Sequence, residues 1–352
     1  MNAEHGHPAR QTLDAELAAL AQAAGRLPDS GLAVESKVLA ALRISNVLQQ
    51  VIRALDEDPY PPLLAEVRRQ TRFLLALDPA ALADEPAAGA GGGDPVARTR
   101  RLYEDAWTVY DEATYRHSVD LILARLRANG YDEAFFAGKD CFDGGCGTAR
   151  FAVAMALLGA RRAVGADMGG RSLEFARAMM ERLGVRNVEL VETDVTDLSA
   201  FAGGSFDFVV SNGVLHHALE TERGIREHFR LVRRGGLFWL YLYGAGGLYW
   251  HIYDALKQTL AAVDSERARR ILLDLDLRQG AIYTYLDNVL APVRKYYYAD
   301  DVVALLRQEG NLEYGLLRGT AAYDDAVLQR QSRWGREILG EQGEVRLWIK
   351  KA

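Results

Sequence analysis

The chain has few cysteines and no excess of positive charge. Two of its 352 residues are cysteines, Cys141 and Cys146, and we expect both to be small buried residues in a reducing compartment. The net charge of −6 argues against a nucleic-acid partner, because proteins that follow phosphate backbones usually carry a basic excess or stripe. The sequence also lacks zinc-finger spacing and any basic-aromatic recognition motif.

Long apolar runs are missing as well. The sequence contains no stretch of about eighteen consecutive apolar residues and no charged-then-apolar leader with a cleavage site. These absences favour a cytoplasmic protein without a membrane partner. Beyond the adjacent His216 and His217, no set of His, Asp or Glu has ligand-like spacing, so we expect no metal. With 49% hydrophobic residues, the chain can build one α/β domain of about 200–250 residues and an accessory region.

The most informative stretch that is present runs from Asp143 to Ala149 and reads Asp-Gly-Gly-Cys-Gly-Thr-Ala. A helix-like run over residues 151–158 follows it directly. Glycines in such a turn let the backbone approach a ligand that a Cβ would block. A turn of this kind at the end of a parallel strand is typical of nucleotide binding, although the turn alone is a weak signal.

The segments after this turn alternate between strand and helix patterns. One short apolar strand ends at Asp167, about two dozen residues after Asp143, where a carboxylate can bind a ribose diol. This rhythm argues for a doubly wound α/β fold, a parallel sheet with helices on both faces. Predicted strands cover residues 162–167, 188–194, 206–212, 237–242, 312–317 and 344–349, and predicted helices cover 151–158, 173–183, 220–232 and 300–309. A turn is predicted at 234–236.

Residues 139–243 resemble the class I S-adenosylmethionine-dependent methyltransferases, which have a Rossmann-like fold. The turn at 143–149 is similar to the acid-x-Gly-x-Gly-x-Gly motif of that family, with Ala149 at the third glycine. Residues 211–217 and 231–236 also match common forms of the family. The resemblance implies a seven-stranded, mostly parallel sheet whose last strand is antiparallel and belongs to an edge hairpin. It also implies that the cofactor is S-adenosyl-L-methionine.

The resemblance carries over to individual cofactor-binding residues. Asp167 would accept both ribose hydroxyls, Met168 would pack on adenine, and Asn212 would face the methionine moiety. Asp194, with the backbone of Val195, would read the amino edge of adenine. The full predicted set for the cofactor is Asp143, Gly145, Gly147, Asp167, Met168, Asp194, Val195, Asn212, Tyr103 and Tyr110.

The regions outside this core are helical by pattern. Residues 1–85 read as several helices, broken near Pro28 and at 59–62, and residues 86–95 as a flexible Ala/Gly linker. Residues 96–352 form the predicted methyltransferase-like domain. In it, Tyr103, Trp107 and Tyr110 are expected to share one helix face. Two interpretations stay open for these rings. They pack against the sheet, or they line the edge of the cofactor site.

A second unusual region, residues 244–299, interrupts the core after the fifth strand as a helical, tyrosine-rich cap. Nine of the sixteen tyrosines lie between Tyr241 and Tyr298. Insertions at the ligand-binding edge usually build a substrate site or a lid, and tyrosine rings suit a partly polar ligand or a sulfonium cation. Alternatively, these tyrosines fill the core of a helical cap.

Methylation of an alcohol, phenol or amine requires removal of a proton near the sulfonium. His217 is the first candidate base, because it follows the fourth strand and a histidine has an ordinary pKa close to neutrality. Asn212 and Tyr249 complete the predicted catalytic set. His216, His251 and Tyr285 are alternatives.

Three functions are compatible with these residues. The first is methyl transfer to an O or N atom of a small-molecule acceptor, in specialised metabolism. The second keeps the cofactor but closes its aminobutyrate chain into azetidine-2-carboxylate, with release of methylthioadenosine. The third is a non-catalytic S-adenosylmethionine-binding subunit. A homodimer formed through the N-terminal helices is a further prediction.

Overall fold

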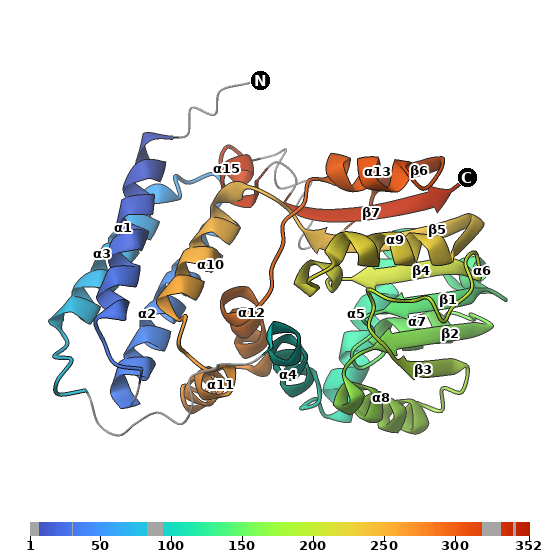
Figure 1. Ribbon diagram of the computed structural model, residues 1–352, viewed down its shortest axis with the longest axis horizontal. Helices are drawn as coiled ribbons and strands as arrows, with labels where there is room; N and C mark the ends of the chain where they lie inside the picture. Colours follow the sequence, from blue (N-terminus) through green and yellow to red (C-terminus); the bar gives the residue numbers. More distant parts are fainter. Residues whose placement is uncertain (1–6, 30, 83–93, 319–331, 341–342) are drawn as a thin grey trace. The chain divides into compact units, whose positions relative to one another are not determined.

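The computed structural model describes residues 7–29, 31–82, 94–318, 332–340 and 343–352 (Figure 1). The chain folds as two compact units that are each assembled from separate stretches. One is helical and comprises Met1–Asp94, Gly246–Ala291 and Leu328–Glu341; the other is an α/β unit of Pro95–Ala245, Pro292–Val327 and Gln342–Ala352. Most of the predicted linker at 86–95 lies outside the described residues.

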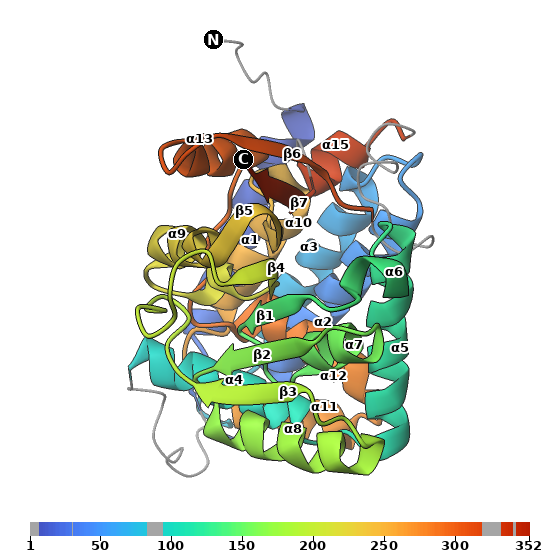
Figure 2. The same ribbon diagram turned by 90° about the vertical axis from the view of Figure 1, so that its right-hand side faces the viewer.

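The α/β unit is built on a seven-stranded sheet with the order β3-β2-β1-β4-β5-β7-β6 (Figure 2). Its strands are β1 (Asp140–Gly144), β2 (Arg162–Asp167), β3 (Val188–Glu192), β4 (Phe206–Asn212), β5 (Val232–Tyr243), β6 (Leu312–Leu316) and β7 (Glu344–Lys351). The first five pair in parallel. β7 runs antiparallel to both β5 and β6. The doubly wound fold and the antiparallel edge hairpin predicted from the sequence are confirmed.

The observed ends of the strands also test the ends that the sequence pattern predicts. β2 and β4 begin and end where the sequence predicts, because each is an apolar run that closes on a polar residue. The sequence predicts a turn at 234–236 before a strand at 237–242. This prediction is wrong, because β5 already begins at Val232. Gly235 has φ +74, and the register with β4 shifts between Phe206 and Phe208. An irregular strand start therefore replaces the predicted turn.

Helices cover both faces of the sheet (Figure 2). One face packs against α5 (Glu112–Ala128), α7 (Arg150–Leu157) and α8 (Gly170–Leu183), and the other against α9 (Thr221–Leu231) and α13 (Ala299–Arg307). Apolar side chains on the two faces form two separate cores, in which Phe208 and Trp239 belong to the first and Phe142 and Phe238 to the second. Cys141 and Cys146 are buried and free, as the sequence predicts.

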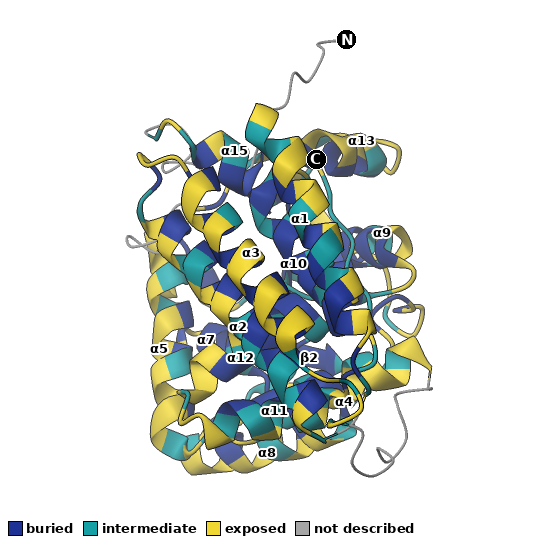
Figure 3. Ribbon diagram, turned by 90° about the vertical axis from the view of Figure 1, so that its left-hand side faces the viewer, coloured by how far each residue is buried: buried dark blue, intermediate teal, exposed yellow. Residues whose placement is uncertain are grey.

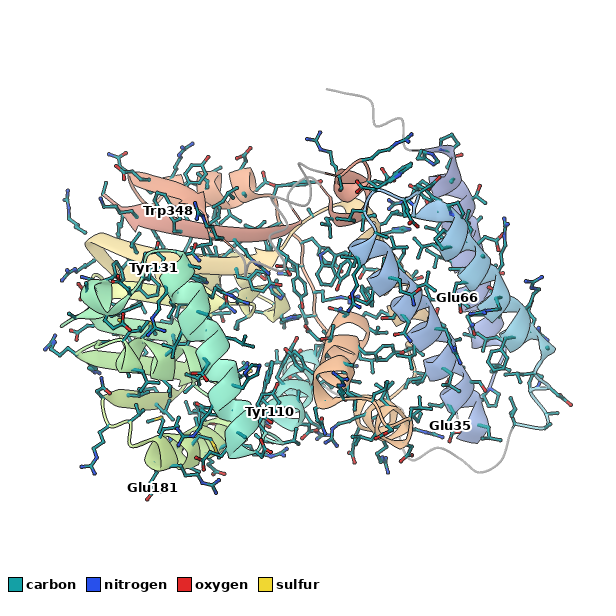
Figure 4. All side chains as sticks on the ribbon, turned by 180° about the vertical axis from the view of Figure 1, so that it is seen from behind. Glu35, Glu66, Tyr110, Tyr131, Glu181 and Trp348 are labelled. Carbon is teal, nitrogen blue, oxygen red and sulfur yellow. The ribbon has the colours of Figure 1, made fainter. Side chains whose placement is uncertain are left out.

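Two helices lead into the first strand. α4 spans Pro95–Trp107, and α5 begins after Asp111, whose carboxylate accepts a hydrogen bond of 2.7 Å from the backbone N–H of Thr114. A short helix, α6 (Glu133–Phe136), follows. Since α4 ends at Trp107, the prediction that Tyr110 shares a helix face with Tyr103 and Trp107 is wrong. Tyr110 lies just before α5, and Tyr131 lies just beyond its other end (Figure 4).

The helical unit combines the N-terminal helices with the insertion that follows β5. Its helices are α1 (Pro8–Gly25), α2 (Gly31–Arg53), α3 (Tyr60–Ala76), α10 (Gly247–Thr259), α11 (Ser265–Asp274), α12 (Gln279–Leu290) and α15 (Gly335–Leu339). α1 and α3 pack together and expose one side each (Figure 3). The predicted break at 59–62 is a helix start, because prolines are tolerated in the first turn of α3. Within the described residues, no helix is both long and apolar enough to cross a membrane.

Two tyrosines of the insertion form hydrogen bonds with residues of α2 within the helical unit. The Tyr253 hydroxyl shares a hydrogen bond of 2.9 Å with Ser45 Oγ and accepts one of 3.1 Å from Gln49 Nε2. The Tyr285 hydroxyl donates to the carbonyl of Val38 at 3.2 Å. Tyr253 and Tyr285 are buried. For these two rings, the structure supports the interpretation that the insertion's tyrosines fill a helical core.

Candidate cofactor and catalytic site

The glycine turn between β1 and α7 is the centre of the site. Gly145 has φ +76, and a Cβ there would lie 2.2 Å from Val214 Cγ1, so only glycine fits against the residue that follows the β4 tip. Gly147 has φ +53, and a Cβ there would meet no atom within 4 Å. The backbone of the turn is therefore packed at Gly145 and open at Gly147. Ala149 adopts φ 61, a left-handed conformation that costs a non-glycine residue about 1–2 kcal/mol.

Asp167, at the end of β2, holds this turn. Its Oδ2 accepts a hydrogen bond of 2.8 Å from Gly147 N–H, and its Oδ1 accepts one of 2.7 Å from Gly169 N–H. Burial raises the pKa of this carboxyl, and the nearby Glu104 carboxylate raises it further. An ionised carboxylate has about four acceptor sites, so Asp167 can accept from a ligand hydroxyl in addition to these backbone bonds.

Asp143 has a different position from Asp167. Its side chain is 3% exposed, and its Oδ2 accepts a hydrogen bond of 3.1 Å from Ala152 N–H in the first turn of α7. Burial raises the pKa of Asp143 to about 7. Asp143 thus ties the turn to α7 from inside, and its predicted contact with the cofactor stays a prediction.

The predicted adenine-side residues lie along the loops after β2 and β3. Met168 is half-buried and Val195 is buried, whereas Asp194 is exposed. Asp194 Oδ1 accepts hydrogen bonds of 2.8 Å from both Thr196 N–H and Thr196 Oγ1, which fixes the turn that follows. Their contacts with adenine stay predictions.

Asn212 lies at the tip of β4 with a fixed amide orientation. Its Oδ1 accepts a hydrogen bond of 3.1 Å from Trp239 Nε1. Because Oδ1 is the acceptor, the amide nitrogen is the group available to donate to a ligand. This orientation is compatible with the predicted contact to the methionine moiety.

The two histidines after β4 have different roles. His216 is completely buried, and burial lowers its pKa well below the ordinary range, so it is neutral. His217 Nδ1 lies 2.8 Å from the carbonyl oxygen of Val293. A carbonyl can only accept, so Nδ1 carries a proton, and in the neutral ring Nε2 carries the lone pair. That is the tautomer that a general base requires.

Tyr103 from α4 joins this histidine, with its ring centroid 5.2 Å from that of His217. Tyr110 packs edge-on against Trp107 at 5.6 Å, and burial raises the pKa of its hydroxyl. Both rings therefore belong to the α/β unit, and Tyr103 lies beside the predicted base. Tyr249 belongs to the helical unit, where its hydroxyl accepts a hydrogen bond of 2.9 Å from Asn288 Nδ2. Its catalytic role stays a prediction.

Sequence reasoning missed two charged residues at this site. Glu104 of α4 is 8% exposed, and its Oε1 accepts a hydrogen bond of 3.1 Å from the N–H of Arg171 at the start of α8. Arg150 follows the glycine turn directly, and its guanidinium lies 3.9 Å from the centroid of Trp107. The sequence offered one signal for each residue. Glu104 directly follows Tyr103 in the aromatic pattern of α4, and Arg150 directly follows the glycine motif.

The residues present fit S-adenosylmethionine. The open space over Gly147 admits a ligand at the backbone, and the Asp167 carboxylate beside it is an acceptor for hydroxyl groups. The Asn212 amide presents its donor end at the neighbouring strand tip. Within the described residues, no group of three His, Cys, Asp or Glu side chains could hold a metal ion.

Comparisons with known proteins agree with this fold. Residues 142–240 match the family model described as a methyltransferase domain. The ubiquinone biosynthesis O-methyltransferase of Methylocella silvestris is 30% identical over 174 residues, which cover 44% of this chain and 66% of the relative. The arsenite methyltransferase of Aquipseudomonas alcaligenes is 31% identical over 153 residues, covering 36% of this chain and 44% of that protein.

The chain thus spans less than two thirds of the length of these curated relatives. Among solved structures, the YcgJ protein from Bacillus subtilis aligns with 67% of this chain and 99% of its own, with 17% identity and a TM-score of 0.42. The family model, the relatives and the sheet topology identify the region around residues 142–240 as a class I S-adenosylmethionine-dependent methyltransferase domain, and this domain and fold imply S-adenosyl-L-methionine as the cofactor.

Proposed function

We propose that the protein transfers a methyl group from S-adenosylmethionine to an oxygen or nitrogen atom of a small-molecule acceptor. The observation that carries this proposal is the tautomer of His217, fixed by the Val293 carbonyl 2.8 Å away. An acceptor hydroxyl or amine must lose a proton as it is methylated, and the Nε2 lone pair can take it. The similarity to ubiquinone biosynthesis O-methyltransferases supports an oxygen acceptor.

Different residues of the chain have different roles in this reaction. Asp167 and the turn at Gly147 hold the cofactor, Asn212 orients its reactive end, and His217 removes the acceptor proton. When bound, S-adenosylmethionine supplies an already activated methyl group. The protein therefore contributes alignment, proton removal and exclusion of water rather than a covalent step.

The decisive experiment incubates the purified protein with S-adenosylmethionine, alone and with a panel of phenols, alcohols and amines, and identifies the nucleoside products by mass spectrometry. S-adenosylhomocysteine that forms only when an acceptor is added is the expected result. Methylthioadenosine without acceptor would instead support cyclisation to azetidine-2-carboxylate. Tight binding with neither product would support a non-catalytic subunit.

Three finer predictions belong to the same proposal. They are a place in specialised metabolism, a cytoplasmic location, and a homodimer that forms through the N-terminal helices. Light scattering after gel filtration tests the last of these, since a monomer at micromolar concentration contradicts it.

A further inference from the structure

The C-terminal half of α4 contacts three segments that build the cofactor site. Tyr103 packs on His217 after β4, with 5.2 Å between the ring centroids. Trp107 stacks on the guanidinium of Arg150 after the glycine turn, at 3.9 Å. Glu104 binds the start of α8, the helix that follows β2 (Figure 2). This part of α4 therefore borders the carboxyl ends of β1, β2 and β4.

Glu104 is a buried acid that uses one of its two carboxylate oxygens within the protein. Its side chain is 8% exposed, and its Oε1 accepts a hydrogen bond of 3.1 Å from the backbone N–H of Arg171. Among the described residues, no group donates a hydrogen bond to its Oε2. Burying a carboxylate is costly unless hydrogen bonds replace the lost water. Oε2 is thus an acceptor that the protein itself leaves unused.

Glu104 lies beside Asp167, the predicted acceptor of the ribose diol. A Cβ on Gly169 would lie 3.0 Å from Asp167 Oδ1 and 3.3 Å from Glu104 Oε1, so the two carboxylates flank the same point. Burial raises the pKa of Asp167, and the charge of Glu104 raises it further. Two neighbouring carboxylates repel each other, and hydrogen-bond donors directed at both offset that repulsion. A ligand with two adjacent hydroxyl groups supplies two such donors.

The surroundings of the two acids suit a bound ribose. Asp167 accepts from Gly147 N–H through Oδ2 and from Gly169 N–H through Oδ1, and the space over Gly147 is open. Hydrogen bonds to an ionised acceptor are about twice as strong as neutral ones. We propose that Glu104 is a second acceptor for the ribose hydroxyls of S-adenosylmethionine, so that Asp167 and Glu104 share the diol. The helix α4 is then part of the cofactor site.

This inference rests on the proposed placement of the diol at Asp167, and it is tested by binding rather than by methyl transfer. The alternative is that Glu104 only holds α4 against α8. Asp105, the next residue of α4, provides the matched control, because its Oδ1 lies 2.8 Å from the guanidinium of the same Arg171. Asp105→Asn weakens the contact between α4 and α8 and leaves the Glu104 carboxylate in place.

The test measures, by calorimetry, the affinity of S-adenosylhomocysteine and of its 2′-deoxy and 3′-deoxy analogues for the full-length protein. In wild type, we expect the loss of either hydroxyl to weaken binding about tenfold or more. Glu104→Gln keeps an oxygen for Arg171 N–H but removes the charge, so S-adenosylhomocysteine should bind about tenfold more weakly. In this variant, the penalty for one of the two missing hydroxyls should shrink at least about threefold, because that hydroxyl has already lost its charged partner. Asp105→Asn should keep the wild-type penalties.

Two results would overturn the proposal. If the penalties for both hydroxyls change by less than about threefold in Glu104→Gln, neither hydroxyl binds Glu104, and a lower melting temperature of that ligand-free variant would then assign Glu104 to the docking of α4. If Asp105→Asn shrinks a penalty as much as Glu104→Gln does, the effect comes from a loosened α4 and not from a direct bond.

Failure of this inference and failure of the proposed methyl transfer are distinguishable. If both deoxy analogues bind wild type as tightly as S-adenosylhomocysteine, and Asp167→Ala binds like wild type, the diol lies elsewhere and the role of Glu104 falls, whereas methyl transfer is untouched. If the penalty shrinks as expected in Glu104→Gln but no acceptor yields S-adenosylhomocysteine, Glu104 keeps its place in the cofactor site and methyl transfer fails.

Discussion

The two units of the chain treat their buried polar groups differently. In the helical unit, the hydroxyls of Tyr253 and Tyr285 are bound by α2, and the Lys37 ammonium donates to the carbonyl of Leu27 and to Asp29. In the α/β unit, several buried polar atoms have no hydrogen-bond partner among the described residues, including Thr148 Oγ1, Ser211 Oγ, His216 Nε2 and Arg125 Nε. Thr148 belongs to the glycine turn, Ser211 and His216 lie at and just after the end of β4, and Arg125 lies near the end of α5.

The helical unit pairs most of its buried polar groups with its own residues, whereas the α/β unit leaves several such groups available to a ligand. Buried polar groups are almost always hydrogen-bonded in folded proteins, so unpaired ones that gather in one place indicate a binding function. The helical unit uses its polar side chains to fix its own packing, with Ser332 Oγ as an exception among its described residues. The α/β unit leaves comparable groups unpaired in the glycine turn and at the end of β4, and also Asp140 Oδ1 at the start of β1, away from the proposed site.

The largest effect is expected for the proposed base. His217→Asn keeps a side-chain donor that can reach the Val293 carbonyl but removes the Nε2 lone pair. We expect kcat to fall by about 10²–10⁴-fold, the usual contribution of general base catalysis, while the affinity for S-adenosylmethionine stays within about twofold of wild type. His117→Asn, on the exposed side of α5, is the control. Undiminished turnover of His217→Asn at saturating acceptor would remove His217 from the mechanism.

Asp143 provides a pH-dependent test of the buried polar groups in the α/β unit. Its pKa is raised from 3.8 to about 7 by burial, so the folded state favours the protonated carboxyl. The stability that this provides is complete below the unfolded pKa and is lost as pH rises from about 4 to 7. Three pKa units correspond to about 4 kcal/mol at most. Asp143→Asn, which keeps an acceptor for Ala152 N–H, should lack this loss.

Urea unfolding of wild type and Asp143→Asn at a series of pH values measures this effect. We expect the difference in unfolding free energy to grow in favour of the variant between pH 4 and 7, then to level off. A constant difference across this range would show that Asp143 is ionised in the folded protein.

A smaller effect is expected in the helical unit. Tyr253→Phe leaves Ser45 Oγ and Gln49 Nε2 without their shared partner, which should lower the unfolding free energy by about 1–3 kcal/mol. Tyr298→Phe, at a residue that is 41% exposed, should change stability by less than about 0.5 kcal/mol. Thermal or urea unfolding distinguishes them. Equal stabilities would mean that the Tyr253 hydrogen bonds contribute nothing to the packing of this unit.

Local sequence patterns predicted the elements that depend on local chemistry. β2 and β4 are short apolar runs that close on Asp167 and Asn212, and the glycine turn depends on conformations that neighbouring residues dictate. The start of β5 was missed because its irregular register with β4 depends on a tertiary pairing. The end of α4 was placed too late because the aromatic spacing continues into Tyr110, beyond the helix.

Contacts between segments far apart in the chain could not be predicted from the sequence. The tyrosines of the insertion suggested a ligand enclosure, yet the partners of Tyr253 and Tyr285 lie on α2, some two hundred residues away in the chain. Arg346 and Tyr241 are likewise distant in the chain, and neither belongs to a recognisable motif. The Arg346 guanidinium lies 5.0 Å from the ring centroid of Tyr241 because β7 pairs with β5.

The affinity of S-adenosylhomocysteine for Asp167→Ala and for Tyr253→Phe, measured side by side by calorimetry, tests the contrast between the units most directly. Asp167→Ala should weaken binding at least about 100-fold, because it removes the proposed diol acceptor and the bond to Gly147 N–H. Tyr253→Phe should bind like wild type while its melting temperature falls. Unchanged affinity in Asp167→Ala, or lost affinity in Tyr253→Phe, would contradict the account.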